Sequence, residues 1–278
     1  SSEYLSDYIE AAQTPEIDSI NFKIRNNGVQ FYANTHDPEN KTRYYRWEYD
    51  ETWLYTSLYN SIVQYRDSVL EPRAINNPIY FCWQTVSSNN ILLGSSANLS
   101  DDVIKDGPVS FVSAASGKLT YGYSILVRQY ALSEDAYNYW LNLKKNTEQL
   151  GSIFDAQPSI ASGNIHCLSN PAEPVIGYLS ASTATVKRFY FDNKLLPLDS
   201  PSYTGLPTSE ACEYRSISIS PLSTFSSRVF DTFSSGYYIP TNPISVAGLG
   251  TVAYAYSRKD CVDCRLKGGT NVKPIFWP

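Results

Sequence analysis

The chain has 278 residues, of which 42% are hydrophobic, 18% are charged and 14% are aromatic, and its formal net charge is −5. This balance excludes an intrinsically disordered chain, because apolar side chains are plentiful and the net charge is small. The mild acidity and the lack of a run of Lys or Arg argue against nucleic acid as a partner. No apolar stretch of the sequence reaches the roughly 20 residues that span a bilayer.

The N-terminal residues have neither the basic nor the apolar region of a signal peptide. The sequence also contains no Met. We therefore expect translation to begin upstream of residue 1, and we interpret residues 1–16 as a linker from a missing upstream domain.

Strand-forming residues are frequent, since the chain contains 23 Tyr and 11 Phe, and aromatic side chains suit the half-buried face of a pleated strand. Apolar and polar residues alternate over Ile17–Arg25 and Val29–Asn34, and the Asn-Asn-Gly connector between them has the backbone freedom of a hairpin turn. The same alternation predicts a strand over Tyr44–Thr52, with Tyr45 and Trp47 on its buried face.

The pattern weakens over Tyr55–Asn77, where β-branched residues are few. This segment is predicted to be an insertion that supports at most a short helix. Further strands are predicted over Ile79–Val86, Ile91–Gly94, Val109–Ala114, Tyr121–Leu132, Asn164–Leu168 and Val175–Phe191.

One helix is predicted in this β background, over about 134–150. Ser133 is a favourable N-cap, and the acidic Glu134 and Asp135 lie near the positive end of the helix dipole. An apolar stripe follows, and Gly151 suits the left-handed residue that ends a helix.

From Asp192 the composition shifts to Pro, Ser and Thr, which marks a boundary. We expect residues 17–191 to form an antiparallel fibronectin- or immunoglobulin-like sandwich with inserted helices, and residues 192–278 to form a C-terminal extension packed on it. The elements predicted in this extension are a helix over Pro221–Phe233 and strands over Tyr237–Pro240 and Val252–Tyr256.

The sequence contains no recognisable catalytic constellation. Neither His36 nor His166 has the spacing of a metal site, and no G-x-S-x-G elbow is present. The pairs Asp101-Asp102 and Glu134-Asp135 are interpreted as loop and helix-start charges rather than a glycosidase pair. Tyr and Trp rings can stack on sugars, but here they alternate with polar residues and are expected to fill the core. We assign no catalytic, metal-ligating or cofactor-binding residue.

The five cysteines are more informative. The C-x-x-C spacing of Cys261 and Cys264 can hold zinc, form a redox pair or close a disulfide, and no second C-x-x-C supports zinc. We favour a disulfide framework in which both residues are oxidised. A pair between Cys212 and Cys261 is slightly favoured over a local ring closed by a Cys261–Cys264 disulfide. Cys82 and Cys167 either pair across the core or remain buried thiols, and one of the five thiols is left over.

Several longer motifs occur together: Thr35-His36-Asp37-Pro38, Thr42–Trp53, Tyr123–Leu132 running into Tyr139-Trp140 and Leu143–Asp155, Gly163–Cys167 with Asn170-Pro171, and motifs within the closing Cys261–Trp277. With these motifs the chain resembles the domain-of-unknown-function family 4249, lipoproteins of Bacteroidota, from about Ile17 to Trp277. The resemblance implies a lipidated Cys and a small immunoglobulin-like domain upstream of residue 1, with an anchor in the outer membrane. It implies no catalytic residue.

The resemblance and the cysteine usage together predict a non-enzymatic, surface-exposed outer-membrane lipoprotein. We expect it to act as an accessory or ligand-capturing subunit of a TonB-dependent receptor or a similar envelope complex, without a cofactor. Two alternatives remain: a structural component of an envelope assembly, and a hydrolase of glycans or peptides that uses carboxylates brought together by the fold.

Overall fold

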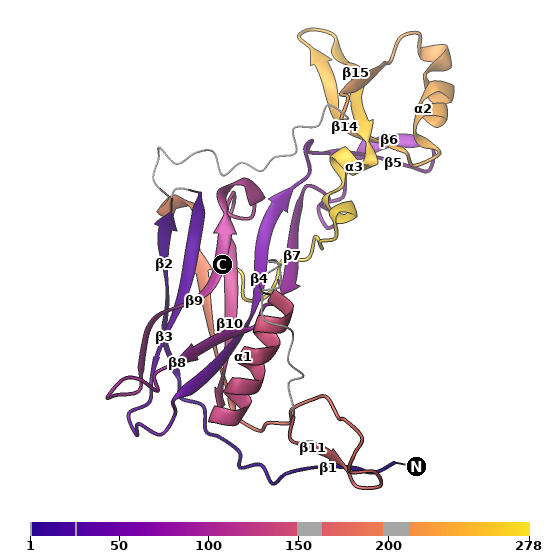
Figure 1. Cartoon of the computed structure of the whole chain (residues 1–278). Coiled ribbons are helices and arrows are strands. Elements are labelled where there is room, and N and C mark those ends of the chain that lie inside the picture. The colour runs from indigo at the N-terminus through magenta and orange to yellow at the C-terminus, as the bar shows by residue number, and fades with distance from the viewer. Residues whose placement is uncertain (1, 26, 149–162, 197–211) are drawn as a thin grey trace, which may run out of the picture. The chain divides into compact units, whose positions relative to one another are not determined.

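Antiparallel strands dominate the computed structural model, which describes residues 2–25, 27–148, 163–196 and 212–278 (Figure 1). The mainly β fold class is therefore confirmed. Two compact units are interleaved along the chain, so contiguous intervals such as 17–191 and 192–278 do not coincide with them. Unit 1 consists of Ser1–Glu51, Val86–Ser113 and Ser124–Tyr190, and unit 2 of Thr52–Thr85, Ala114–Tyr123 and Phe191–Pro278.

The strands are β1 (Tyr4–Ser6), β2 (Ile17–Arg25), β3 (Gly28–His36), β4 (Tyr44–Thr56), β5 (Val63–Arg66), β6 (Val69–Pro72), β7 (Phe81–Ser87), β8 (Leu92–Ser95), β9 (Val103–Ser113), β10 (Tyr123–Leu132), β11 (Ile165–Cys167), β12 (Ala184–Phe191), β13 (Arg215–Ser218), β14 (Tyr238–Val246) and β15 (Gly250–Arg258). The helices are α1 (Glu134–Glu148), α2 (Phe225–Phe233) and α3 (Lys259–Val262), with 3-10 turns η1 (Ala114–Ser116), η2 (Asn193–Leu195), η3 (Leu222–Thr224) and η4 (Cys264–Lys267).

One sheet has the strand order β2-β3-β9, and a second has the order β12-β10-β4-β7 with β8 paired to β4. The predicted β2–β3 hairpin is confirmed, because Arg25 pairs with Gly28 across the turn. The predicted strand at the start of β4 is also confirmed, and Tyr45 and Trp47 are both buried. The Trp47 ring lies so close to Gly94 of β8 that a Cβ there would stand 2.2 Å from it, which explains the glycine.

Gln129 of β10 is fully buried, at 0% exposure, and connects three other parts of unit 1. Its Nε2 donates to the carbonyl oxygen of Pro15 and to Oγ1 of Thr35 in β3, both at 2.9 Å. Its Oε1 accepts a 2.8 Å hydrogen bond from Nε1 of Trp47 in β4. A buried amide with all these partners fixes the two sheets and the N-terminal segment against one another.

A second buried polar group lies at Asp102, which is 2% exposed. Its carboxylate accepts hydrogen bonds from the hydroxyls of Tyr45 and Ser96, and its backbone N–H donates to Oδ1 of Asn40 at 2.7 Å. Burial and the hydrogen bond to Asp102 raise the pKa of Tyr45 well above its usual value, so Tyr45 stays a donor at all ordinary pH.

Helix α1 begins where the sequence predicts, and the Ser133 hydroxyl accepts a 3.2 Å hydrogen bond from the N–H of Ala136. The predicted last residues, 149–150, and Gly151 lie outside the described residues. The helix packs against β4 (Figure 1), where the guanidinium of Arg46 lies 4.4 Å from the centre of the Trp140 ring.

The expectation that Tyr55–Asn77 supports at most a short helix is wrong, because the structure forms the β5–β6 hairpin there. Asp67 and Ser68 form its two-residue turn and both have positive φ, 50° and 67°. Such a turn matches the twist of the flanking strands. It commonly carries Asn or Gly, but the two residues of this turn are neither.

Other predicted strand limits change. β9 begins at Val103 instead of Val109, β12 covers only the last part of Val175–Phe191, and residues 4–6 of the predicted linker form β1, which pairs with β11. These segments carry weak alternation, so their pairing depends on neighbours that lie far away in the sequence.

In unit 2, strands β13, β15 and β14 form a sheet, and α2 packs Val229 and Phe233 against Ile217 and the Tyr256 ring. The predicted helix within Pro221–Phe233 is confirmed from Phe225 onward, after the η3 turn. Both strands of the β14–β15 hairpin extend well beyond the predicted limits.

Two disulfides lie in unit 2. Cys212 pairs with Cys261, as the sequence favoured, and Cys82 pairs with Cys264 across 182 residues. Both Cys261 and Cys264 are thus oxidised, the local ring is not formed, and a Cys82–Cys167 pair is wrong. Cys167 is a buried free thiol, with its Sγ 3.3 Å from Oγ of Ser169.

We predict that Tyr45→Phe lowers the free energy of unfolding by about 1–3 kcal/mol, because buried Asp102 loses a hydrogen-bond donor. Urea denaturation measures this change. Tyr8→Phe is the matched control, because the Tyr8 side chain is fully exposed and is expected to change stability by less than about 0.5 kcal/mol. Equal effects of the two substitutions would contradict the role given to Asp102.

We predict that non-reducing peptide mapping recovers Cys82 linked to Cys264 and Cys212 linked to Cys261. Replacing Cys82 and Cys264 together with Ser is expected to lower the free energy of unfolding by about 2–5 kcal/mol, since a long loop is released. Cys167→Ser, which breaks no disulfide, serves as the control. Recovery of a Cys261–Cys264 ring would contradict the pairing.

Candidate functional site

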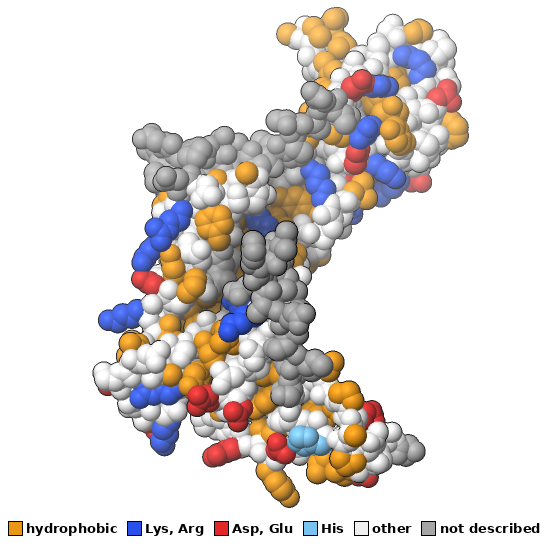
Figure 2. Space-filling view, viewed as in Figure 1, with side chains coloured by type: hydrophobic (Ala, Val, Ile, Leu, Met, Phe, Trp, Pro, Cys, Tyr) orange, Lys and Arg blue, Asp and Glu red, His pale blue; other side chains and the backbone are white. Residues whose placement is uncertain are grey.

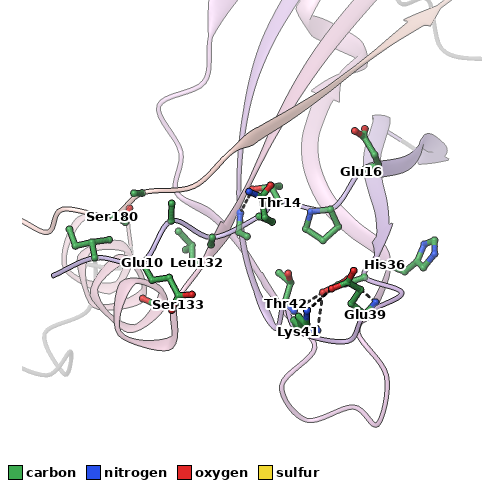
Figure 3. Close-up of a pocket in the computed structure, with 18 of the residues that line it drawn as sticks. Glu10, Thr14, Glu16, His36, Glu39, Lys41, Thr42, Leu132, Ser133 and Ser180 are labelled. Carbon is green, nitrogen blue, oxygen red and sulfur yellow. Dashed lines mark hydrogen bonds and ion pairs between the residues drawn. The ribbon is translucent and has the colours of Figure 1, made fainter.

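A groove of about 870 Å³ lies in unit 1 (Figure 3). Its walls come from four segments: residues 9–18, residues 36–42 at the end of β3, residues 131–133 at the end of β10, and residues 178–181 before β12. Figure 3 shows Glu10 at one end, and Glu16, His36 and Glu39 at the other.

The N-terminal wall is held in place by hydrogen bonds within unit 1. The N–H of Ala12 donates to the carbonyl of Ala181, and the N–H of Thr183 donates to the carbonyl of Ala12, both at 3.0 Å. The N–H of Ala131 donates to Oγ1 of Thr14 at 2.9 Å, and Thr14 is buried. This wall is therefore part of the scaffold at residues 12–14.

The loop of residues 37–42 is organised by Asp37. Its carboxylate accepts hydrogen bonds from the backbone N–H groups of Thr42, Glu39 and Lys41, at 2.8 to 3.0 Å. Burial acts to raise the pKa of Asp37, but these N–H donors outweigh it, and the pKa is lowered. Asp37 is thus an ionised structural group and not a proton donor.

His36 and Asp18 form an ion pair at the edge of the groove. Nδ1 of His36 lies 2.8 Å from Oδ2 of Asp18, and both side chains are about half exposed. The hydrogen bond and the charge of Asp18 raise the pKa of His36. Among the described residues, His36 has no hydrogen bond to a hydroxyl or a thiol, so the geometry contains no nucleophile–base pair at this histidine.

The groove continues into a second hollow of about 570 Å³ beside the start of α1. Ile9, Glu10, Ser133 and Tyr178 line both parts. The second part adds Tyr139, whose ring centre lies 5.3 Å from that of Tyr178. Aromatic rings and carboxylates therefore line one continuous surface feature.

Three groove carboxylates interact with neighbours within unit 1. Asp18 forms an ion pair with His36, Asp37 accepts hydrogen bonds from its loop, and Glu39 forms an ion pair with Lys41 at 2.6 Å. In the part of the chain that the structure describes, Glu10, Glu16 and Asp135 have no hydrogen-bond or ion-pair partner for their side chains. The groove therefore carries uncompensated negative charge. No group of three or more metal-ligating side chains occurs among the described residues.

The cysteines singled out from the sequence do not line this groove. Cys82, Cys212, Cys261 and Cys264 all lie in unit 2, and Cys167 lies in β11. Sequence reasoning missed the groove, because its four segments are far apart along the chain. The signal available was weak: Glu10 and Glu16 lie in a segment interpreted as a linker, where charge is ordinary.

A family model described as Domain of unknown function (DUF4249) matches residues 1–188, more than half of the chain. The chain belongs to the DUF4249 family. The match covers every groove segment of this DUF4249 protein, whereas the closing Cys261–Trp277 motif lies beyond it. Neither a curated protein nor a solved structure matches the chain.

Among the described helices, none combines the length and the apolar character that crossing a membrane requires.

We predict that the imidazole of His36 titrates with a pKa above about 6.5, the ordinary value, and that Asp18→Asn brings it back down. NMR titration of the ring protons measures this. The ion pair contributes to stability fully below about pH 6.5, and the contribution is lost as the pH rises through the raised pKa. Glu39→Gln is the control and should leave the pKa of His36 in place; an unchanged pKa in Asp18→Asn would contradict the pairing.

Proposed function

We propose that this DUF4249 protein is a surface-exposed, lipid-anchored outer-membrane protein that captures a ligand as the accessory subunit of a TonB-dependent receptor or a similar envelope complex. The observation that carries this proposal is the open groove of unit 1, which joins aromatic rings, apolar side chains and unpaired carboxylates. A groove of several hundred Å³ with a few convergent polar groups is typical of a binding site.

Two of the groove carboxylates, Asp37 and Asp18, are engaged in structural contacts. A carboxylate-dependent hydrolase needs one carboxyl group that holds a proton near neutral pH. Asp37 has a lowered pKa and is committed to its loop, and Asp18 is paired with His36. Neither of these two carboxylates is therefore suited to supply that proton.

We propose that the β2-β3-β9 sheet and the unit 1 part of the sheet containing β12, β10, β4 and β8 form a fibronectin- or immunoglobulin-like sandwich. The hydrogen bonds of Gln129 in β10 to Thr35 in β3 and to Trp47 in β4 support this arrangement, because they join side chains of both sheets in one core. Such a sandwich presents its loops at its ends, where they are free to form binding surfaces.

A partner surface is available in unit 2 on the β14–β15 hairpin. Figure 2 shows hydrophobic side chains gathered there, and Ile244, Val246 and Leu249 are exposed, Leu249 at 75%. Exposed apolar side chains on neighbouring positions are typical of protein contact sites. A purely structural envelope component would use this hairpin but would have no use for the groove.

The test of the proposal is co-purification from solubilised outer membranes of the native host, with protease shaving of intact cells to test surface exposure. We expect the chain to be recovered with an envelope partner and to be released by shaving. Recovery as a free monomer, or complete protection from protease, would contradict the proposal.

We predict that replacing Val246 and Leu249 together with Lys lowers recovery of the envelope partner at least about tenfold, because charged side chains cannot be buried in an apolar contact. Quantitative mass spectrometry of the co-purified proteins measures this. Replacing Ile75 and Val272 together with Lys is the matched control, because these exposed apolar residues of unit 2 lie outside the hairpin. Equal losses in both variants would contradict a contact at the hairpin.

A further inference from the structure

We infer that the groove of unit 1 binds an extended, positively charged peptide segment, which adds as a strand to the backbone of residues 8–11 and places cationic side chains against Glu10 and Glu16. This inference names the ligand class of the groove on which the proposed function rests.

The backbone of residues 8–11 is available for pairing. The N–H of Asp7 donates to the carbonyl of Asn164 at 3.1 Å, and the N–H of Ala12 donates to the carbonyl of Ala181 at 3.0 Å. Between these anchors, the backbone groups of residues 8–11 make no hydrogen bond with any described residue. An anchored segment with unpaired backbone groups offers a template for an added strand, and main-chain hydrogen bonds then supply affinity.

The groove beside this segment also has an apolar surface. Ile9, Pro38, Leu132 and Leu179 line it, and Leu179 is more than half exposed. Side chains of an extended peptide point alternately to opposite sides, so every second one faces this surface. The groove thus suits a peptide that alternates apolar and polar residues.

The charge of the groove selects a cationic peptide. Glu10 and Glu16 lie at opposite ends of the groove in Figure 3, and neither has an ion-pair partner among the described residues. Because the two carboxylates lie at opposite ends, a small ion with one charge pairs with only one of them. Six residues of extended peptide reach up to about 20 Å. A peptide with basic residues near both ends reaches both.

Two other classes of ligand, a neutral glycan and a small polycation, fit the groove less completely. The rings of Tyr139 and Tyr178 and the nearby Asn138 and Asn142 offer contacts to a neutral glycan, but such a ligand leaves Glu10 unpaired. A small polycation pairs with the carboxylates but does not use the unpaired backbone.

The experiment measures fluorescence anisotropy of a labelled peptide, Lys-Val-Thr-Val-Thr-Val-Lys, titrated with the whole chain. We expect binding that weakens as NaCl is raised from 50 to 300 mM, because exposed charge pairs are screened. The same peptide with Glu in place of Lys is expected not to bind. A version with N-methylated amides at alternate residues is expected to lose binding, because it cannot pair as a strand.

The protein variant that tests the carboxylates is Glu10→Gln combined with Glu16→Gln. Each exposed charge pair contributes about a threefold change in affinity, so the double variant should bind the basic peptide about tenfold more weakly. Asp67→Asn combined with Asp231→Asn changes the net charge equally, but at exposed positions of unit 2, and should bind within about twofold of the unchanged protein. Circular dichroism verifies that both variants are folded.

Equal binding of the basic and the acidic peptide, or an unchanged affinity in the Glu10 and Glu16 variant, would overturn the inference. Spermine that binds as tightly as the peptide, together with full binding of the N-methylated peptide, would replace it with a small-polycation site. These measurements use the isolated chain and the envelope test uses native membranes, so the two proposals fail separately: the chain can find its partner in membranes without binding this peptide, and the reverse also holds.

Discussion

The buried amide of Gln129 is the interaction on which unit 1 depends. Its three hydrogen bonds reach Trp47, Thr35 and the carbonyl of Pro15, so one side chain joins strands β4, β3 and β10 to the N-terminal segment. An unsatisfied amide in this place costs about 1–3 kcal/mol for each lost partner, so these partners are held firmly in place. Because Pro15 is part of the groove wall, the core of unit 1 also determines where that wall lies.

The same N-terminal segment forms one wall of the groove, and hydrogen bonds fix only part of it. Thr14 and Ala12 are fixed by hydrogen bonds to β10 and to the segment before β12, whereas residues 8–11 are not. Asp37 fixes the facing loop with its own carboxylate. Glu10 and Glu16, which also line the groove, have no partner among the described residues. Unit 2 is stabilised differently, because two disulfides close long loops around a small apolar cluster at Ile79 and Val262.

The sequence predicts elements that are set by local signals. Alternation and the Asn-Asn-Gly turn predict β2 and β3, and the Ser133 cap predicts α1. The β5–β6 hairpin is missed, because its turn at Asp67 and Ser68 has no Gly or Asn to indicate positive φ. The Cys82–Cys264 disulfide and the groove are missed for a different reason: each joins segments far apart in the chain, and no local pattern records such a contact.

Hydrogen exchange of the backbone amides of residues 8–11 tests the account most directly, since it reports on the unpaired edge itself. In the free protein these amides are expected to exchange rapidly, because they have no hydrogen-bond acceptor among the described residues. Saturation with the basic peptide should protect alternate amides of this segment, as strand addition requires. Peptide binding that leaves all of these amides unprotected would contradict the account.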